Sequence, residues 1–181
     1  MRFLICLFTI LMLLTGCENN TSQINFLTNG LKFEKIYGEF STNITDKTPD
    51  RLNNINLGVN KLNGTKINPG DTFSFNNCIG PRNEETGFEE AIIFDGHGNK
   101  TEGYGGGLCQ ISSTLYNAAI NAGMEIVERH EHSRDVPYIE EGKYATVVDG
   151  VEDLKFKNNS SSVVTINATT DNDVLLITLK N

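Results

Sequence analysis

Residues 103–123 read GYGGGLCQISSTLYNAAINAG, and this stretch decides how the surrounding chain folds. Apolar side chains recur in it at helical spacing, and Gly123 closes the pattern. The stretch therefore predicts a helix that begins directly after the three glycines and places Cys109 at its N-terminus. The apolar face of this helix would consist of Ile111, Leu115, Ala118, Ala119 and Ala122.

A second helix is predicted further upstream. Thr48-Pro49-Asp50 supplies an N-cap residue, a proline at the first helical position and an acid in the first turn. Apolar residues then follow at helical spacing up to Leu62. Strand-like segments are expected at residues 31–40, 73–75, 89–94, 125–130, 145–148, 154–156, 163–166 and 174–179. The predicted class is α+β, with a mixed or antiparallel sheet and two main helices.

The N-terminus has the features of a lipoprotein signal peptide. One positive charge at Arg2 precedes an apolar run that is too short for a stop-transfer helix, and Leu14-Thr15-Gly16-Cys17 places two small residues before a cysteine. We expect a cleaved signal peptide at residues 1–16, a lipidated Cys17 with a polar tether to residue 30, and one domain at residues 31–181. An ordinary signal peptide or an uncleaved anchor helix are the alternatives. Lipidation would hold the domain outside the cell, at the outer face of the cytoplasmic membrane.

Charge and cysteine content exclude several functions. Loss of Arg2 with the signal peptide would take the formal net charge from −8 to −9, which disfavours nucleic-acid binding. Of the four cysteines, Cys6 would leave with the signal peptide and Cys17 would carry the lipid. Cys78 and Cys109 remain, and they could pair in an oxidising compartment. The absence of Cys-x-x-Cys or histidine-rich spacing predicts no metal site, and no cofactor is expected.

Cys109 is the main candidate for chemistry. A helix N-terminus offers unpaired amides and the positive end of the helix dipole, and both favour a thiolate. Gly105, Gly106 and Gly107 would let a substrate backbone approach closely, and the free amides could form an oxyanion hole for acyl transfer. Two structural interpretations remain open: a small buried hydrophobic residue, or a disulfide with Cys78.

Three further residues are candidates for roles beside the thiol. His130 and His132 lie 21 and 23 residues downstream of Cys109, and either could be the base. Strand alternation would send both histidines to the same face. Arg82 is a candidate for a bidentate contact to a substrate carboxylate, although an arginine in such a turn is more often a surface ion-pair partner.

Several motifs together resemble the VanW domain over about residues 38–168. They are FSFN at 73–76, IGPR at 79–82, GF at 87–88, GGGLCQISSTLYNA at 105–118 and ERHEHS at 128–133. The resemblance implies a cell-wall role in an exported or membrane-anchored protein. It further implies an L,D-transpeptidase that acts through Cys109, with the surrounding motif residues in contact with substrate. The predicted substrate-binding set is Arg82, Gly105, Gly106, Gly107, Gln110, Ser112 and Ser113.

The chain departs from the family pattern at two positions. Tyr144 stands where members commonly have aspartate, so Asp149 or Asp153 would have to supply any role of that aspartate. Cys78 stands where a threonine or an aliphatic residue is expected, and it could cap or regulate Cys109.

The expected function is that of a cysteine acyltransferase acting on peptidoglycan stem peptides. Cys109 would attack a carbonyl between an L- and a D-centre, a histidine would carry the proton, and an amine or water would resolve the thioester. The alternative is a non-catalytic module that binds stem peptides or lipid-linked precursors and assists vancomycin resistance or wall assembly.

Overall fold

The structure is a computed structural model, and it describes residues 35–95 and 97–181. The predicted signal peptide, Cys17 and the tether to residue 30 lie outside the described residues. No helix in the described part is both long and apolar enough to cross a membrane. The predicted α+β class is confirmed, and all strand pairing in the described sheets is antiparallel.

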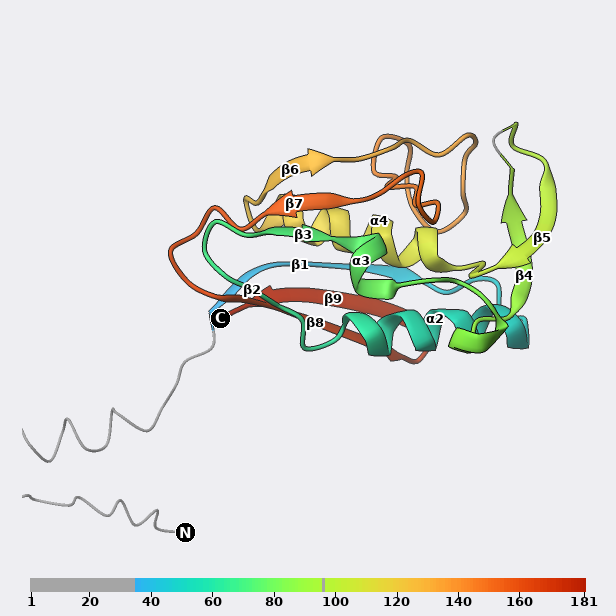
Figure 1. Cartoon of the computed structure of the whole chain (residues 1–181), viewed down its shortest axis with the longest axis horizontal. Coiled ribbons are helices and arrows are strands. Elements are labelled where there is room, and N and C mark those ends of the chain that lie inside the picture. Colours follow the sequence, from blue (N-terminus) through green and yellow to red (C-terminus); the bar gives the residue numbers. More distant parts are fainter. Residues whose placement is uncertain (1–34, 96) are drawn as a thin grey trace, which may run out of the picture. The chain divides into compact units, whose positions relative to one another are not determined.

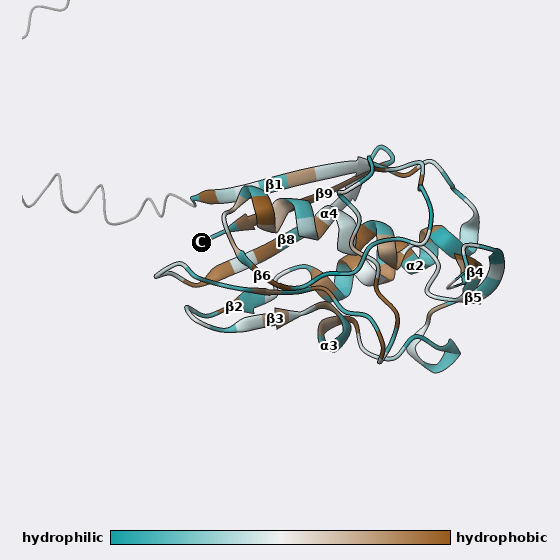
Figure 2. Ribbon diagram, turned by 90° about the horizontal axis from the view of Figure 1, so that it is seen from above, coloured by the Kyte–Doolittle hydropathy of each residue, from teal (hydrophilic) through white to brown (hydrophobic). Residues whose placement is uncertain are grey.

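The largest sheet in the described part of the chain has four strands (Figure 1). Its order is β1 (Ile36–Asn43), β9 (Val174–Lys180), β8 (Val164–Asp171) and β2 (Lys66–Ile67). Apolar residues alternate along β8, which is visible as brown bands in Figure 2, and the residues at 164, 166 and 168 are buried. Because alternate side chains point to the same face of a strand, this pattern marks the covered face of the sheet.

Two helices cover that face. Helix α2 (Pro49–Leu62) packs on β8, and helix α4 (Leu108–Asn121) packs on β1 and β9. β1 crosses the last turn of α4 at Gly38, where an added Cβ would come within 2.3 Å of the Ala122 nitrogen. Only glycine permits this approach, since any larger residue would collide with the helix backbone.

A three-stranded sheet completes the core around α4. Its order is β3 (Thr72–Ser74), β7 (Lys155–Lys157) and β6 (Glu125–Glu128). The rings of Phe73 and Phe156 stack across β3 and β7 with centroids 5.0 Å apart. Helix α4 contacts β6 as well as the four-stranded sheet, so it is buried on most sides.

Short elements connect these layers. Helix α3 (Phe75–Ile79) and the 3₁₀ helix η1 (Glu84–Thr86) follow β3, and the hairpin of β4 (Glu90–Phe94) and β5 (Lys100–Tyr104) leads directly into α4. The hairpin therefore stands beside the N-terminus of α4 (Figure 1).

Three sequence predictions need correction. The strand expected at residues 73–75 ends at Ser74, because the Ser74 side chain accepts the amide of Asn77 and starts α3. The strand expected at residues 125–130 ends at Glu128, and His130 forms only an isolated bridge to Thr146. The strand expected at residues 145–148 does not form, and only isolated bridges occur there, at Thr146 and Val148. Both predicted helices are confirmed.

Candidate functional site

The three glycines before α4 let neighbouring elements approach the start of the helix. A Cβ at Gly106 would lie 2.9 Å from the Ala91 Cβ of β4, and one at Gly107 would lie 2.8 Å from Ile55 of α2. Gly107 also has φ +113°, a conformation that side-chain-bearing residues rarely adopt. The glycines thus bring α2 and the β4–β5 hairpin against the residues that lead into Cys109.

The serines of α4 hold an extended segment, residues 143–147, along the helix. The Ser112 hydroxyl donates to the Ala145 carbonyl, and the Ser113 hydroxyl accepts the Ala145 amide at 2.9 Å. The Asn117 side chain donates to the Lys143 carbonyl at 2.9 Å. Helix side chains thus satisfy both polar groups of Ala145, and the backbone on either side makes only isolated bridges, Thr146 with His130 and Val148 with Glu152. The predicted strand at 145–148 is therefore replaced by a segment attached mainly to α4.

The same segment places a carbonyl beside the cysteine. Cys109 is the second residue of α4, and its thiol donates to the Val147 carbonyl at 3.6 Å. The backbone amides of the two residues that flank Cys109 are both bonded. The Leu108 amide donates to the Gly105 carbonyl at 3.1 Å, and the Gln110 amide donates to the Gly107 carbonyl at 3.0 Å. Among the described residues the Cys109 amide has no such acceptor, so it is the free donor of this first turn.

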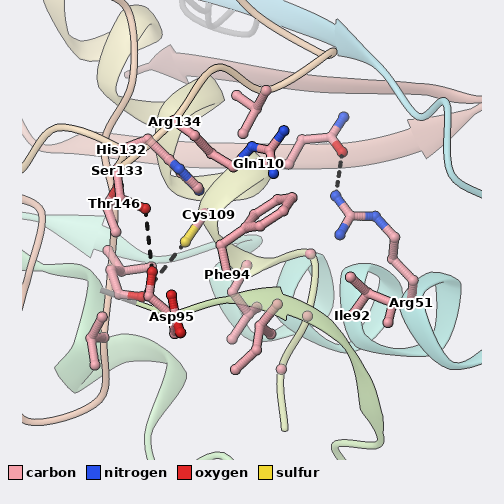
Figure 3. A pocket seen from close by; sticks show the side chains of 18 of the residues that line it. Arg51, Ile92, Phe94, Asp95, Cys109, Gln110, His132, Ser133, Arg134 and Thr146 are labelled. Carbon is pink, nitrogen blue, oxygen red and sulfur yellow. Dashed lines mark hydrogen bonds between the residues drawn. The ribbon is translucent and has the colours of Figure 1, made fainter. Parts of the chain in front are cut away.

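A cavity of about 980 Å³ opens over Cys109 (Figure 3). Its floor is the glycine turn and the start of α4. Its walls come from the β4–β5 hairpin, the loop at residues 131–138, the segment at 146–152 and the first turn of α2. The hairpin and the loop meet across it: Arg134 lies over the Phe94 ring at 4.7 Å, and Ser133 donates to the Asp95 carbonyl at 3.3 Å.

Besides Arg134, two arginines reach the cavity, one from α2 and one from the loop after α3. Arg51, in α2, donates to the Gln110 side chain at 3.3 Å. Arg82 donates to the Asn76 side chain and, at 3.5 Å, to the same Val147 carbonyl that accepts the thiol. Both guanidinium groups act electrostatically on Cys109. Gln110 is buried and also donates to Thr42, so it fixes Arg51 relative to β1.

The two candidate histidines lie in different surroundings. His132 lines the cavity with Cys109, and its ring meets Phe94 edge-on at 5.7 Å (Figure 3). His130 is not among the lining residues, and its Nε2 lies 3.0 Å from the Glu128 carboxylate. Lys155 and His130 together lower the pKa of Glu128 to about 2. The structure thus brings His132, and not His130, into the cavity of Cys109.

The thiol and the imidazole are both neutral near pH 7. Burial raises the pKa of Cys109 above its ordinary 9.0, although Arg82 and Arg51 oppose this change. Burial likewise lowers the pKa of His132 below 6.5. The sequence led us to expect a thiolate at the helix start, but burial, which disfavours the charged form, is the largest effect on the pKa of Cys109. A neutral imidazole is able to accept a proton from the thiol.

Unpaired polar atoms gather at this cavity. Four buried side-chain polar atoms in the described part of the chain have no hydrogen-bond partner: Arg51 Nε, Arg82 Nε, His132 Nδ1 and Thr146 Oγ1. All four residues line the cavity. Buried polar atoms are normally satisfied, and each exception needs an explanation. A polar ligand in the cavity would supply these atoms with partners.

The remaining predicted residues divide between the cavity and its support. Gly105, Gly106, Gly107 and Gln110 line the cavity, whereas Ser112 and Ser113 lie behind it and hold residues 143–147. Cys78 and Cys109 are both free, and Cys78 contacts the Lys61 carbonyl and Thr65 away from the cavity.

Tyr144 lies at the position where the resemblance led us to expect an aspartate. The Tyr144 hydroxyl donates to Asp135 at 2.9 Å, and its ring meets His132 with centroids 6.2 Å apart. Asp149 lines the cavity, whereas Asp153 is buried against Ser74 and the Asn76 amide. Of the two proposed substitutes, only Asp149 therefore faces the cavity.

Sequence reasoning missed Arg51, Phe94 and Thr146. Arg51 follows a clear helix start, but nothing in the local pattern distinguishes it from a solvated arginine. In the described residues, no group of three or more His, Cys, Asp or Glu side chains is arranged to hold a metal ion.

The fold and the cavity define a class of small α+β domain in which a half-buried thiol shares a cavity with an imidazole and three guanidinium groups. The sequence model of the VanW like protein family matches residues 50–180, and the chain belongs to this family.

Two curated relatives are similar to the chain. One is an uncharacterized protein, YoaR, of Bacillus subtilis, which is 38% identical over 142 residues, or 78% of this chain and 46% of the relative. The other is the vancomycin B-type resistance protein VanW of Enterococcus faecalis, 29% identical over 149 residues, or 80% of this chain and 50% of the relative. The chain thus spans about half the length of the curated relatives it matches. No solved structure gives a significant match.

Proposed function

We propose that this protein acts at the cell envelope, on peptidoglycan stem peptides, as a cysteine acyltransferase of the L,D-transpeptidase type. The observation that carries the proposal is the cavity of Cys109, which gathers all four unpartnered buried side-chain polar atoms of the described residues. A peptide, which alternates amide donors and carbonyl acceptors, fits such a lining. The resistance protein among the relatives supports an envelope role.

The first half-reaction uses groups that face the cavity. His132 takes the proton from the Cys109 thiol, and the sulfur attacks the carbonyl carbon between an L- and a D-centre. The free Cys109 amide donates to the oxygen that becomes negative. The carbon–nitrogen bond then breaks, and the leaving amine takes the proton from His132. The product is a thioester on Cys109.

The second half-reaction restores the thiol. An amine of a second stem peptide, or water, loses a proton to His132 and attacks the thioester carbonyl. The carbon–sulfur bond breaks, and the sulfur regains the proton from the imidazole. Because the resting thiol and imidazole are both neutral, this pair itself carries no charge between turnovers.

A second candidate function is non-catalytic binding of stem peptides or lipid-linked precursors. The raised pKa of Cys109 favours it, because a neutral thiol bonded to Val147 is a poor nucleophile until its proton is removed. In this case the cavity would bind the peptide without forming a thioester.

Incubation of the purified protein with muropeptides, followed by mass spectrometry, separates the two candidates. Catalysis predicts a mass increase on Cys109 and cross-linked or trimmed products, both lost in Cys109→Ala. The matched control is Cys78→Ala, which should retain products because Cys78 does not line the cavity. Binding without products, equal in wild type and Cys109→Ala, would reject the transferase and favour the second candidate.

A further inference from the structure

Arginines are distributed unevenly relative to the cavity. Of the four arginines in the described residues, Arg129 pairs with Glu131 at 3.0 Å and lies outside the cavity lining. The other three, Arg51, Arg82 and Arg134, line the cavity, and none has a carboxylate within ion-pair distance in the described residues. In a chain with 23 acidic and 15 basic residues, unpaired arginines are not explained by a shortage of acids.

The Arg134 guanidinium has partners other than a carboxylate. Its guanidinium lies over the Phe94 ring at 4.7 Å and donates to the Gly98 carbonyl at 3.3 Å, so it closes the hairpin against the loop. Arg51 and Arg82 differ, because each has a buried Nε without a partner. The side chain of Asp149 acts on Arg82 electrostatically without reaching ion-pair distance.

We infer that Arg51 and Arg82 together form a carboxylate-binding subsite next to Cys109, and that this subsite selects substrates whose D-residue is the chain end. The inference rests on the proposed function for the identity of the substrate. It adds Arg51, on α2, as a specificity-determining residue.

Covalent geometry connects the subsite to the reaction. When the attacked carbonyl joins an L-residue to a terminal D-residue, the terminal carboxylate lies only three bonds from the attacked carbon. Both guanidinium groups are close enough to Cys109 to act on it electrostatically, and they approach it from different elements. A planar guanidinium with a free Nε–H can donate through Nε and one terminal nitrogen to one carboxylate.

The test compares two synthetic peptides that end in the same L-to-D bond, one with a free C-terminal carboxylate and one with a C-terminal amide. Affinities are measured by calorimetry on the full chain carrying Cys109→Ala, so that no turnover occurs. The acid should bind about tenfold or more tightly than the amide, as expected for a charge-assisted pair. Adding Arg51→Gln should reduce the affinity for the acid by a similar factor and leave that for the amide unchanged.

Two further variants keep the test specific. Arg51→Lys retains the positive charge but lacks the two-nitrogen geometry of the guanidinium, so it should restore part of the preference for the acid over the amide. Arg134→Gln removes the same charge from the same cavity and should leave the acid-to-amide ratio unchanged. Thermal unfolding of each variant checks that it folds. Equal affinity for acid and amide, or a loss of preference in Arg134→Gln as large as in Arg51→Gln, would overturn the inference.

The outcome also separates the inference from the proposed function. If wild type converts both peptides equally well, the transferase stands and the subsite is wrong. If the acid is preferred in binding but neither peptide is converted, the subsite stands and the transferase is wrong. If neither peptide binds or reacts, both are wrong.

Discussion

At the scale of single residues, burial decides the state of the candidate nucleophile. The N-terminus of α4 stabilises a negative charge at Cys109, and Arg82 and Arg51 act in the same direction. Burial nevertheless disfavours the charged thiolate, and this effect is the largest of those that act on the pKa of Cys109. The proposed reaction therefore depends on a base that lines the same cavity, such as His132.

The pH dependence of Cys109 alkylation should report the raised pKa of the thiol directly. In the free protein, the rate of modification by iodoacetamide should rise with pH and reach its midpoint above 9.0, because the thiolate is the reacting form. Peptide mapping by mass spectrometry separates Cys109 from Cys78. A midpoint below the ordinary value of 9.0 would contradict the assignment of burial as the dominant effect.

The pH dependence of turnover should identify the base. Folded His132 has a pKa below 6.5, so it is neutral and able to accept a proton at pH 7. As pH falls through that pKa, the imidazole becomes protonated and kcat/KM should fall, which places the acidic limb of the profile below 6.5.

The two histidines provide a matched pair for this measurement. His132→Gln should remove the acidic limb of the pH profile and slow turnover by about 10²–10⁴-fold, the usual contribution of a positioned base. His130→Gln should preserve the limb, since His130 pairs with Glu128 outside the cavity lining. The opposite pattern would assign the base to His130.

Sequence alone could not choose between these histidines. The choice depends on β6 ending at Glu128, after which the chain leaves the strand and the alternation rule no longer applies. Arg51 was missed for a related reason. Its position over Gly107 follows from the packing of α2 on the start of α4, which involves residues more than 50 positions apart.

At the scale of elements, α4 is central to the site. Its apolar residues pack on β1 and β9, as the helical spacing predicts, and its polar residues bind neighbouring segments. The serines bind both polar groups of Ala145, and this cannot be predicted from residues 145–148 themselves, whose composition favours a strand. The elements with strong local patterns, α2, α4, β8 and β9, were predictable; this segment was not.

Ser113→Ala should weaken the attachment of this segment. The Ala145 amide would lose its acceptor in a buried place, which costs about 1–3 kcal/mol of unfolding free energy. Urea denaturation measures the difference. Ser133→Ala is the control, because its exposed hydroxyl bonds a carbonyl at the cavity rim, and it should change stability by less than about 0.5 kcal/mol. Equal effects of the two changes would contradict a special role for Ser113.

At the scale of the whole molecule, attachment to the membrane remains a prediction from residues 1–17. If Cys17 carries the lipid, Cys17→Ser should move the protein from the membrane fraction to the medium or leave it with an uncleaved signal peptide. Fractionation and intact-mass measurement check this. Arg2→Lys keeps the positive charge and is the matched control, which should remain membrane-bound. A Cys17→Ser protein that stays in the membrane fraction with a processed N-terminus would contradict lipidation.

The pairing of β1 with β9 has a consequence for how the protein acquires its structure. Phe40 lies opposite Ile177, so the sheet under α4 closes only when segments more than 130 residues apart in sequence have met. Contacts of such high sequence separation slow folding, because the intervening loop must be ordered first. A partly synthesised chain without β9 therefore lacks the strand on which α4 rests. The cavity over the start of α4 therefore forms only after the last strand of the chain has been made.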